Sequence, residues 1–321
     1  MRKMSAKKIA LFVLRAVLVV APIAWIYARA DSGSIVAALA STNVPALVCV
    51  TAMLIVTMVL QGVKWWVTIR RFAPDLRVGK AVSVHLESSF YSIILPSALA
   101  QDVVKSVMLS RDHSPQIVWA ATWMAKLMGF FTLIILSVVG MLYLESDSLP
   151  AGFRPAVVIA VAAITAMAAV SFSKRITRPL RAAAAKFAGI KIIAFAEKLR
   201  DGIYAFKHER AVLVQTFLIS AVIQLLLISN ASLLVYAVSG EFFFIECLAF
   251  VPLVEIMAVS LPLTPGGMGI REALMALLFT RLGFSEGQTA SYVTISLALS
   301  MTRLIGGIPV ILKSFKRHAG K

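Results

Sequence analysis

The sequence predicts an all-α polytopic membrane protein, with about six transmembrane helices plus two re-entrant broken-helix hairpins in an inverted repeat (eight hydrophobic segments). Of its 321 residues, 60% are hydrophobic and 15% are charged, whereas soluble domains have roughly 45–50% apolar and 25% charged residues. Several apolar runs reach the roughly 20 residues that a helix needs to cross a bilayer. Two further apolar runs are interrupted by proline and followed by charged residues.

Hydropathy predicts crossing helices at about 9–28, 44–69, 116–143, 154–172, 211–238 and 286–312. The first has basic residues ahead of its apolar run but no Ala-x-Ala cleavage site, so we expect a retained helix and not a cleaved signal peptide. Trp65 and Trp66 lie near the predicted cytoplasmic end of the second helix, and this is typical of the aromatic belt at a membrane interface.

The two interrupted segments lie at about 81–110 and 247–281, and they break at Pro96 and Pro265. A broken helix exposed to lipid would leave N–H and C=O groups without hydrogen-bond partners. Such segments therefore line a cavity, and a pair of them in the two halves of a chain indicates the binding site of a transporter. We expect these two breaks to carry the function.

The distribution of charge favours hairpins over full crossings at the two breaks. The net charge is +17, and the segment 174–210 holds ten Lys or Arg residues against three acidic ones. Full crossings would place this segment on the outer side, against the positive-inside rule, whereas two hairpins make every basic connection cytoplasmic. The basicity therefore indicates anionic lipid headgroups as the partner, and no nucleic acid.

Two hairpins imply a single integral membrane domain over residues 1–321, with inverted halves at about 1–145 and 151–313. A basic amphipathic cytoplasmic linker is expected at about 173–210. The local match between 124–129 (MAKLMG) and 301–306 (MTRLIG) supports an internal repeat. We expect a multi-pass protein of a bacterial-type cytoplasmic (inner) membrane, with both termini cytoplasmic.

Charged side chains within the apolar runs define the candidate site. Each costs roughly 2.5–3.5 kcal/mol at the centre of a bilayer, so such residues usually face a cavity or each other. The candidates for substrate binding are Lys105, Lys126, Arg271, Arg303, Gly266, Gly267 and Gly269; those for orienting the cations or carrying a coupling proton are Glu87, Asp102, Glu255 and Glu272. The alternative is that these charges only form ion pairs that hold the helices together.

The second break has the composition of an anion-binding turn. Gly266, Gly267 and Gly269 can adopt positive φ and leave N–H groups open to a ligand. A helix that begins near 268–270 would point its positive end at the same place, and Arg271 would add a full charge, which together suit a phosphate. The first break has no glycine, and Asp102 and Lys105 are spaced to pair with each other on one helical face.

These residues place the chain near a known family. The stretch 263–273 (LTPGGMGIREA) resembles the Pro-Gly-Gly-x-Gly-x-Arg-Glu motif of the flippase-like family, which includes the membrane region of lysylphosphatidylglycerol synthases of the multiple peptide resistance factor type. The first break is similar to that family's Pro-Gly-Gly-x-x-x-Asp-x-x-Arg motif. It departs from the motif at Ser97 and Ala98, which replace two glycines, and at Lys105, which replaces an arginine. Lys126 likewise stands where the family tends to place a helix arginine, and lysine cannot form a bidentate fork on phosphate.

The resemblance implies a lipid flippase or transporter that moves an anionic, phosphate-bearing lipid between leaflets by alternating access. It also implies a stand-alone membrane region without the soluble transferase domain, so we expect no enzyme, no cofactor and no metal. The alternatives are a small-solute or ion-coupled transporter, and a non-transporting membrane partner of a lipid-modifying enzyme.

Overall fold

Helices make up every regular element of the computed structural model, which describes residues 17, 20–93, 95, 99–144, 152–172, 199–260 and 267–311. No strand occurs among these residues. The predicted all-α membrane fold is therefore confirmed. The two predicted break residues Pro96 and Pro265, and the larger part of the predicted linker at 173–210, lie outside the described residues.

Among the described residues, five helices are long and apolar enough to cross a membrane. They are α3 (Val44–Ile69), α6 (Pro115–Leu142), α7 (Phe153–Phe172), α10 (Arg210–Ser239) and the helical stretch 286–311, which is made of α13 (Glu286–Ser300), the 3-10 helix η4 (Met301–Gly306) and a last turn. Their bounds lie within about two residues of the predicted ones. The predicted first crossing at 9–28 falls partly outside the described residues, and its residues 20–28 are helical.

Local sequence signals explain where several of these helices begin and end. The Asn43 side chain accepts a hydrogen bond from the Ala46 N–H at the start of α3, and Ser285 and Gln288 form a reciprocal capping box at the start of α13. Gly240 ends α10 with a φ of 79°, a conformation that glycine adopts without steric cost.

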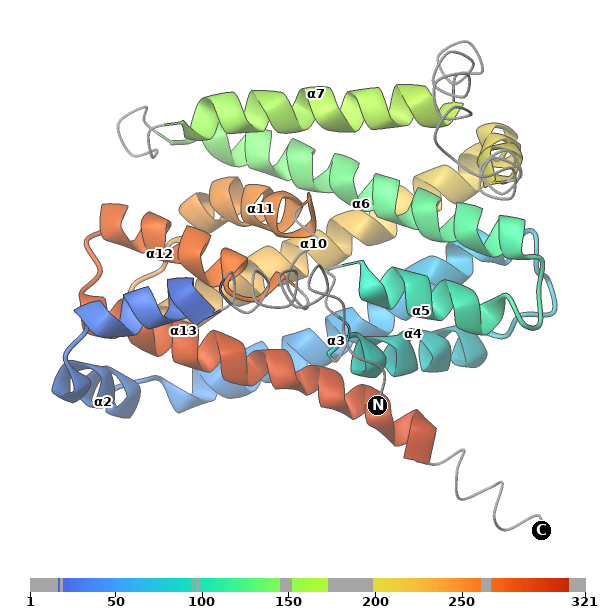
Figure 1. The fold of residues 1–321 in the computed structure, drawn as a ribbon. Helices are drawn as coiled ribbons and strands as arrows, with labels where there is room; N and C mark the ends of the chain where they lie inside the picture. The colour runs from blue at the N-terminus through green and yellow to red at the C-terminus, as the bar shows by residue number, and fades with distance from the viewer. Residues whose placement is uncertain are drawn as a thin grey trace, which may run out of the picture.

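Each predicted broken segment is a pair of short helices. The first pair is α4 (Val78–Ser92) and α5 (Ala100–Leu109), and the second is α11 (Phe244–Ser260) and α12 (Ile270–Arg281). At 1.5 Å per residue these helices are roughly 15–26 Å long, too short to cross a hydrocarbon core of about 30 Å. The two pairs lie toward opposite ends of the bundle (Figure 1).

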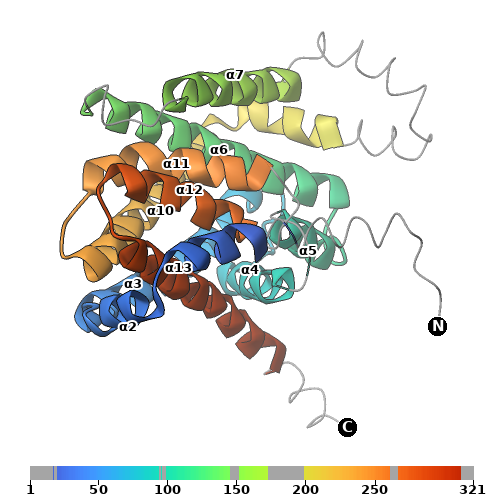
Figure 2. The same ribbon diagram turned by 60° about the vertical axis from the view of Figure 1, so that its left-hand side comes forward.

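The long helices pack around these short pairs. α10 runs along α3, α11 runs along α6, and α7 lies outermost against α6 (Figure 1 and Figure 2). At the opposite edge α2 (Ser32–Ala40) packs on α13. α2 lies between the predicted crossings at 9–28 and 44–69, and it begins there because the Asp31 side chain accepts hydrogen bonds from two N–H groups of its first turn.

Buried apolar side chains form two clusters. One is built mainly from α7, α10, α11, α12 and α13. The other is built from α3, α4, α5 and the first half of α6, together with Phe206 of the short 3-10 helix η2 (Phe206–His208). Some of the helices that carry the polar side chains described below belong to the first cluster, and others belong to the second. The packing of each cluster therefore fixes one part of the site.

The crossing of α6 and α11 is especially close at Gly140. A Cβ atom at this position would lie 2.5 Å from the N atom of Ala249 and 2.8 Å from its Cα atom. Beside it the buried Ser137 hydroxyl donates a hydrogen bond of 2.7 Å to the Ala249 carbonyl. Small residues allow backbones to approach in this way, and the interhelical hydrogen bond adds to the contact.

We predict that Gly140→Ala lowers the free energy of unfolding by about 1–3 kcal/mol, because the added methyl group has no space between the two backbones. The measurement is the Tm of the purified protein in detergent. Gly79→Ala is the matched control, since a Cβ atom there meets nothing within 4 Å, and we expect its Tm to equal or exceed that of the wild type. An unchanged Tm for Gly140→Ala would contradict the close crossing.

Candidate functional site

The predicted site residues are distributed over both short helix pairs and two long helices. They are Glu87 on α4, Asp102 and Lys105 on α5, Lys126 on α6, Glu255 on α11, Arg271 and Glu272 on α12, and Arg303 on η4, with Gly267 and Gly269 just before α12. Pro96, Pro265 and Gly266 lie outside the described residues.

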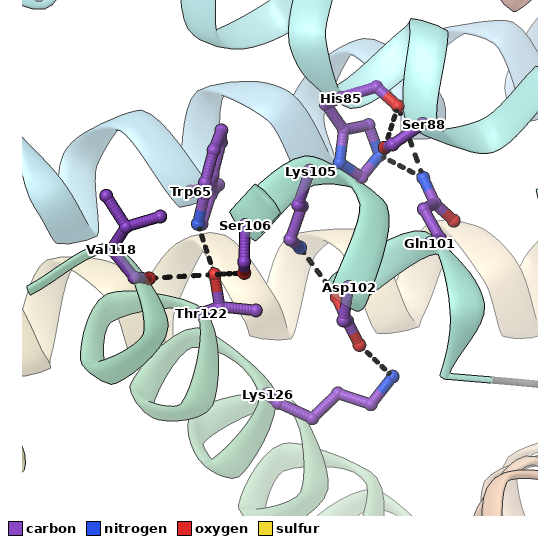
Figure 3. A network of polar contacts seen from close by, with 10 residues as sticks. All are labelled: Trp65, His85, Ser88, Gln101, Asp102, Lys105, Ser106, Val118, Thr122 and Lys126. Carbon is purple, nitrogen blue, oxygen red and sulfur yellow. Dashed lines mark hydrogen bonds and ion pairs between the residues drawn. The ribbon is translucent and has the colours of Figure 1, made fainter. Parts of the chain in front are cut away.

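Asp102 lies between two lysines (Figure 3). Its Oδ1 atom is 2.7 Å from the Nζ atom of Lys105, one turn further along α5, and its Oδ2 atom is 2.9 Å from the Nζ atom of Lys126 on α6. The predicted pairing of Asp102 with Lys105 is therefore confirmed. The same carboxylate also links the first hairpin to a long helix, so it serves two cations at once.

A buried hydrogen-bonded chain holds this part of α5 in place. The indole Nε1–H of Trp65 donates to Thr122 Oγ1 at 2.9 Å, and Thr122 itself donates to the Val118 carbonyl at 3.0 Å. Because the single hydroxyl hydrogen of Thr122 is used in this way, the Ser106 hydroxyl is the donor in its 2.9 Å contact with Thr122 (Figure 3). The chain joins α3, α5 and α6.

The prediction that Trp65 belongs to an interfacial belt is wrong. Its side chain is fully buried, and its ring faces the Lys105 ammonium at 5.4 Å. Trp66 instead lies closer to the surface, where its indole N–H donates to the Leu76 carbonyl and its ring faces Arg70. Two adjacent residues of one helix point to different faces, and the pattern of the sequence did not distinguish them.

Lys64 is a cation of the site that sequence reasoning missed. It lines a cavity of about 160 Å³ together with Asp102, Lys105 and Lys126. Within the described part of the chain no carboxylate lies close enough to form an ion pair with it. The sequence did contain a signal for it, since Gln61 and Lys64 are polar residues one helical turn apart within the apolar run of α3. In the structure both residues line the same cavity.

The second hairpin contains an ion pair of a different kind. The Nε atom of Arg271 on α12 lies 2.9 Å from Oε1 of Glu255 on α11, and Nη2 donates to Oε2 at 3.0 Å. Of these two contacts only the one from Nη2 has hydrogen-bond geometry, and together with the ion-pair contact at Nε it fixes the orientation of the guanidinium. It joins the two arms of the hairpin, whereas in the first hairpin Asp102 pairs within one arm and with a neighbouring helix.

The glycine turn before α12 has the predicted backbone but not the predicted free donor. Gly267 and Gly269 have φ angles of 79° and 83°. The Gly269 N–H, however, donates to the Glu272 carboxylate at 2.7 Å. The expectation that this N–H is open to a ligand is therefore wrong, because Glu272 at the third position of the helix caps the turn itself.

Arg303 is a guanidinium of the site for which the described residues supply no fixed partner. It lies on η4, where the predicted continuous helix tightens into a 3-10 helix, and it makes no ion pair with any described residue. It lines a cavity of about 300 Å³ together with Lys126, Glu255 and Arg271. A 3-10 stretch within a long helix often marks a hinge or a strained functional segment.

Glu87 and Glu272 lie behind the walls of this cavity. Both side chains are buried, at 4% and 3% exposure, and neither is among the residues that line the two cavities. Glu87 accepts a hydrogen bond of 2.7 Å from Ser83 one turn earlier. Their placement fits the predicted orienting role better than direct contact with a substrate.

The two cavities form one polar region between the hairpins. They share lining residues, among them Gln61, His85, Lys126 and Glu255. The charged side chains that line them are Lys64, Lys105, Lys126, Arg271 and Arg303 against Asp102 and Glu255. Basic side chains thus outnumber carboxylates on these walls by five to two, and such a surplus in a low-dielectric bundle favours an anion.

Comparison with protein families supports this description of the chain. The family described as the lysylphosphatidylglycerol synthase TM region matches residues 12–306. The match includes both short helix pairs and all the charged residues of the two cavities. No curated protein matches the chain. The function is thus related to membrane lipids, and the chain belongs to the family of the lysylphosphatidylglycerol synthase TM region.

Proposed function

We propose that this protein moves a lipid with an anionic, phosphate-bearing headgroup between the two leaflets of a bacterial-type inner membrane. The observation that carries the proposal is that five basic side chains against two carboxylates line two connected cavities, which lie between the hairpins and are enclosed by apolar helices. Membership of a family of membrane regions named for a lipid synthase supports a lipid as the substrate. The proposal assigns no covalent step to the chain.

The state of each cation suggests how a headgroup binds. Lys126 and Arg271 are already neutralised by Asp102 and Glu255, whereas Arg303 and Lys64 have no ion-pair partner among the described residues. Arg303 is therefore the strongest candidate for holding the bound phosphate, since binding there breaks no existing ion pair. Arginine also suits phosphate, because its planar fork donates two parallel hydrogen bonds.

The arrangement also suggests how access alternates. Lys126 and Glu255 line both cavities and belong to different halves of the chain. Rocking of one half against the other would widen one side of this region while closing the other, as in transporters built from inverted repeats. Asp102 and Glu255 would take back their cations when the headgroup leaves, or carry a coupling proton.

The decisive experiment uses purified protein in phosphatidylcholine vesicles that contain a trace of fluorescent phosphatidylglycerol, phosphatidylethanolamine or phosphatidylcholine. Quenching of the outer leaflet measures exchange between leaflets. Exchange that is faster for phosphatidylglycerol supports the proposal. Equal rates for all three headgroups, or exchange no faster than in empty vesicles with and without a pH gradient, would instead favour a solute transporter or a non-transporting partner.

We predict that Arg303→Gln slows exchange of phosphatidylglycerol by about tenfold to a hundredfold, the loss expected for one hydrogen bond to a charged group. Its Tm should change little, because Arg303 makes no ion pair with described residues that the substitution would break. The matched control is Arg281→Gln, an exposed residue at the end of α12. Exchange at the wild-type rate in Arg303→Gln would remove Arg303 from the site.

We predict the opposite pattern for Asp102→Asn. The substitution leaves Lys105 and Lys126 without their shared carboxylate, so the free energy of unfolding should fall by about 1–3 kcal/mol for this partly buried pair. Binding of soluble glycerophosphate, measured by calorimetry, should become tighter because the excess charge rises by one. Asp112→Asn is the control, since Asp112 pairs with Lys80 at the surface. Weaker binding by Asp102→Asn would show that the carboxylate does not compete with the anion.

We predict that Arg271→Lys lowers the rate of phosphatidylglycerol exchange markedly but lowers the Tm only slightly. Lysine retains the charge beside Glu255 but loses the Nη2 hydrogen bond to Oε2 and the second nitrogen beside Oε1. Paired measurements of exchange rate and Tm would check this, with Arg281→Lys as the control. Equal rates for Arg271→Lys and the wild type would mean that only the charge of Arg271 matters.

A further inference from the structure

A third cavity lies beside the cation-lined ones and differs from them in character. It is an apolar groove of about 750 Å³ between α5, α6, α7 and α11. Its walls include Trp119 and Trp123 of α6, Ala163 and Met167 of α7, and Met257 of α11. Asp102 and Lys126 are the two charged side chains among its lining residues.

The groove and the polar cavities meet at a single place. Lys126 and Val259 line all three cavities, and Asp102 and Phe130 line both the groove and the smaller polar cavity. The ion pair between Asp102 and Lys126, 2.9 Å long, therefore stands at the junction. On one side of it the walls carry excess positive charge, and on the other side they are apolar.

The groove also opens to the outside of the helix bundle. Val103 on α5 and Ile159 on α7 line it and are 44% and 67% exposed. In a protein that spans a membrane, apolar side chains exposed on α7, one of the crossing helices, face lipid hydrocarbon. A molecule could thus enter the groove sideways from the bilayer.

We propose that this groove binds one acyl chain of the anionic lipid whose headgroup occupies the cation-lined cavities. The inference rests on the proposed function and adds to it a defined site for the acyl chain and a lateral entrance between α5 and α7. The two kinds of cavity are complementary to an amphiphile, because an amphiphile has a charged end and an apolar end. The structure places a cationic cavity and an apolar groove on the two sides of one ion pair.

The proposal also assigns a step to that ion pair. A phosphate that arrives with its chain in the groove meets Lys126 first, since this ammonium lines the groove as well as both polar cavities. The phosphate then replaces Asp102 as the partner of Lys126, while Asp102 keeps Lys105. One cation is thus exchanged between two anions, and no charge is left unpaired.

The test uses two adjacent alanines of α7. Ala163 and Ala162 are both exposed, but Ala163 lines the groove and Ala162 does not. Ala163→Trp should fill the groove, and Ala162→Trp is the matched control. The probe is phosphatidylglycerol with a photoactivatable diazirine in one acyl chain, in phosphatidylcholine vesicles, and the labelled peptides are mapped by mass spectrometry.

We expect the wild type to be labelled on the groove-lining segments of α5, α6 and α7, and excess phosphatidylglycerol but not phosphatidylcholine to compete. In Ala163→Trp the labelling should disappear and exchange between leaflets should fall by roughly tenfold or more, as the exclusion of even two methylene groups would produce. Ala162→Trp should behave as the wild type, and soluble glycerophosphate should bind all three proteins equally.

Two results would overturn the acyl-chain site in the groove, and both can be distinguished from a failure of the proposed function. Labelling spread evenly over the lipid-facing helices, or unchanged exchange in Ala163→Trp, would remove the groove while leaving the headgroup site intact. A wild type that neither exchanges phosphatidylglycerol nor binds glycerophosphate would refute both proposals. Loss of glycerophosphate binding in Ala163→Trp would show that the groove is not separate from the headgroup site.

Discussion

The constraint that shapes this molecule is the cost of placing charges within an apolar bundle, which an opposite charge close by lowers. Asp102 lowers it by pairing with two lysines from two helices, and Glu255 by pairing with the guanidinium of Arg271. Each pair sets the position of a short helix that cannot cross the membrane by itself. The breaks in the helices and the charges are therefore one design, since the charges hold the interrupted segments in place and the interruptions give the charges a cavity to line.

The two hairpins solve this problem with different chemistry. The first relies on lysines, which are compact point charges, and on the face of Trp65. The second relies on the guanidinium of Arg271 and on a glycine turn that Glu272 closes. A headgroup between them would meet a diffuse positive field on one side and directional donors on the other. The departure of the first break from the family motif is thus matched by a site that differs in kind and not only in sequence.

Much of the fold could be predicted because it depends on local signals. The first residues of α3 and α6 could be predicted from the N-cap residue Asn43 and from the proline that begins α6. The lengths of the crossing helices could be predicted from the lengths of the apolar runs. The charged residues were recognised for the same reason, because a charge in an apolar run stands out. The features that could not be predicted depend on how helices pack. Examples are the burial of Trp65, the approach of Lys64 to the lysines of other helices, and the capture of the Gly269 N–H by Glu272.

The close crossing at Gly140 has a kinematic consequence. The backbones of α6 and α11 are in contact there, and the hydrogen bond from Ser137 to Ala249 lies beside the contact. The two helices can therefore neither slide past each other nor separate at this point without losing that hydrogen bond. Since α6 belongs to the first half of the chain and α11 to the second, rocking of the halves must turn about this crossing. Gly140 would then mark the pivot of the transport cycle, and a larger residue there would displace the pivot as well as weaken the packing.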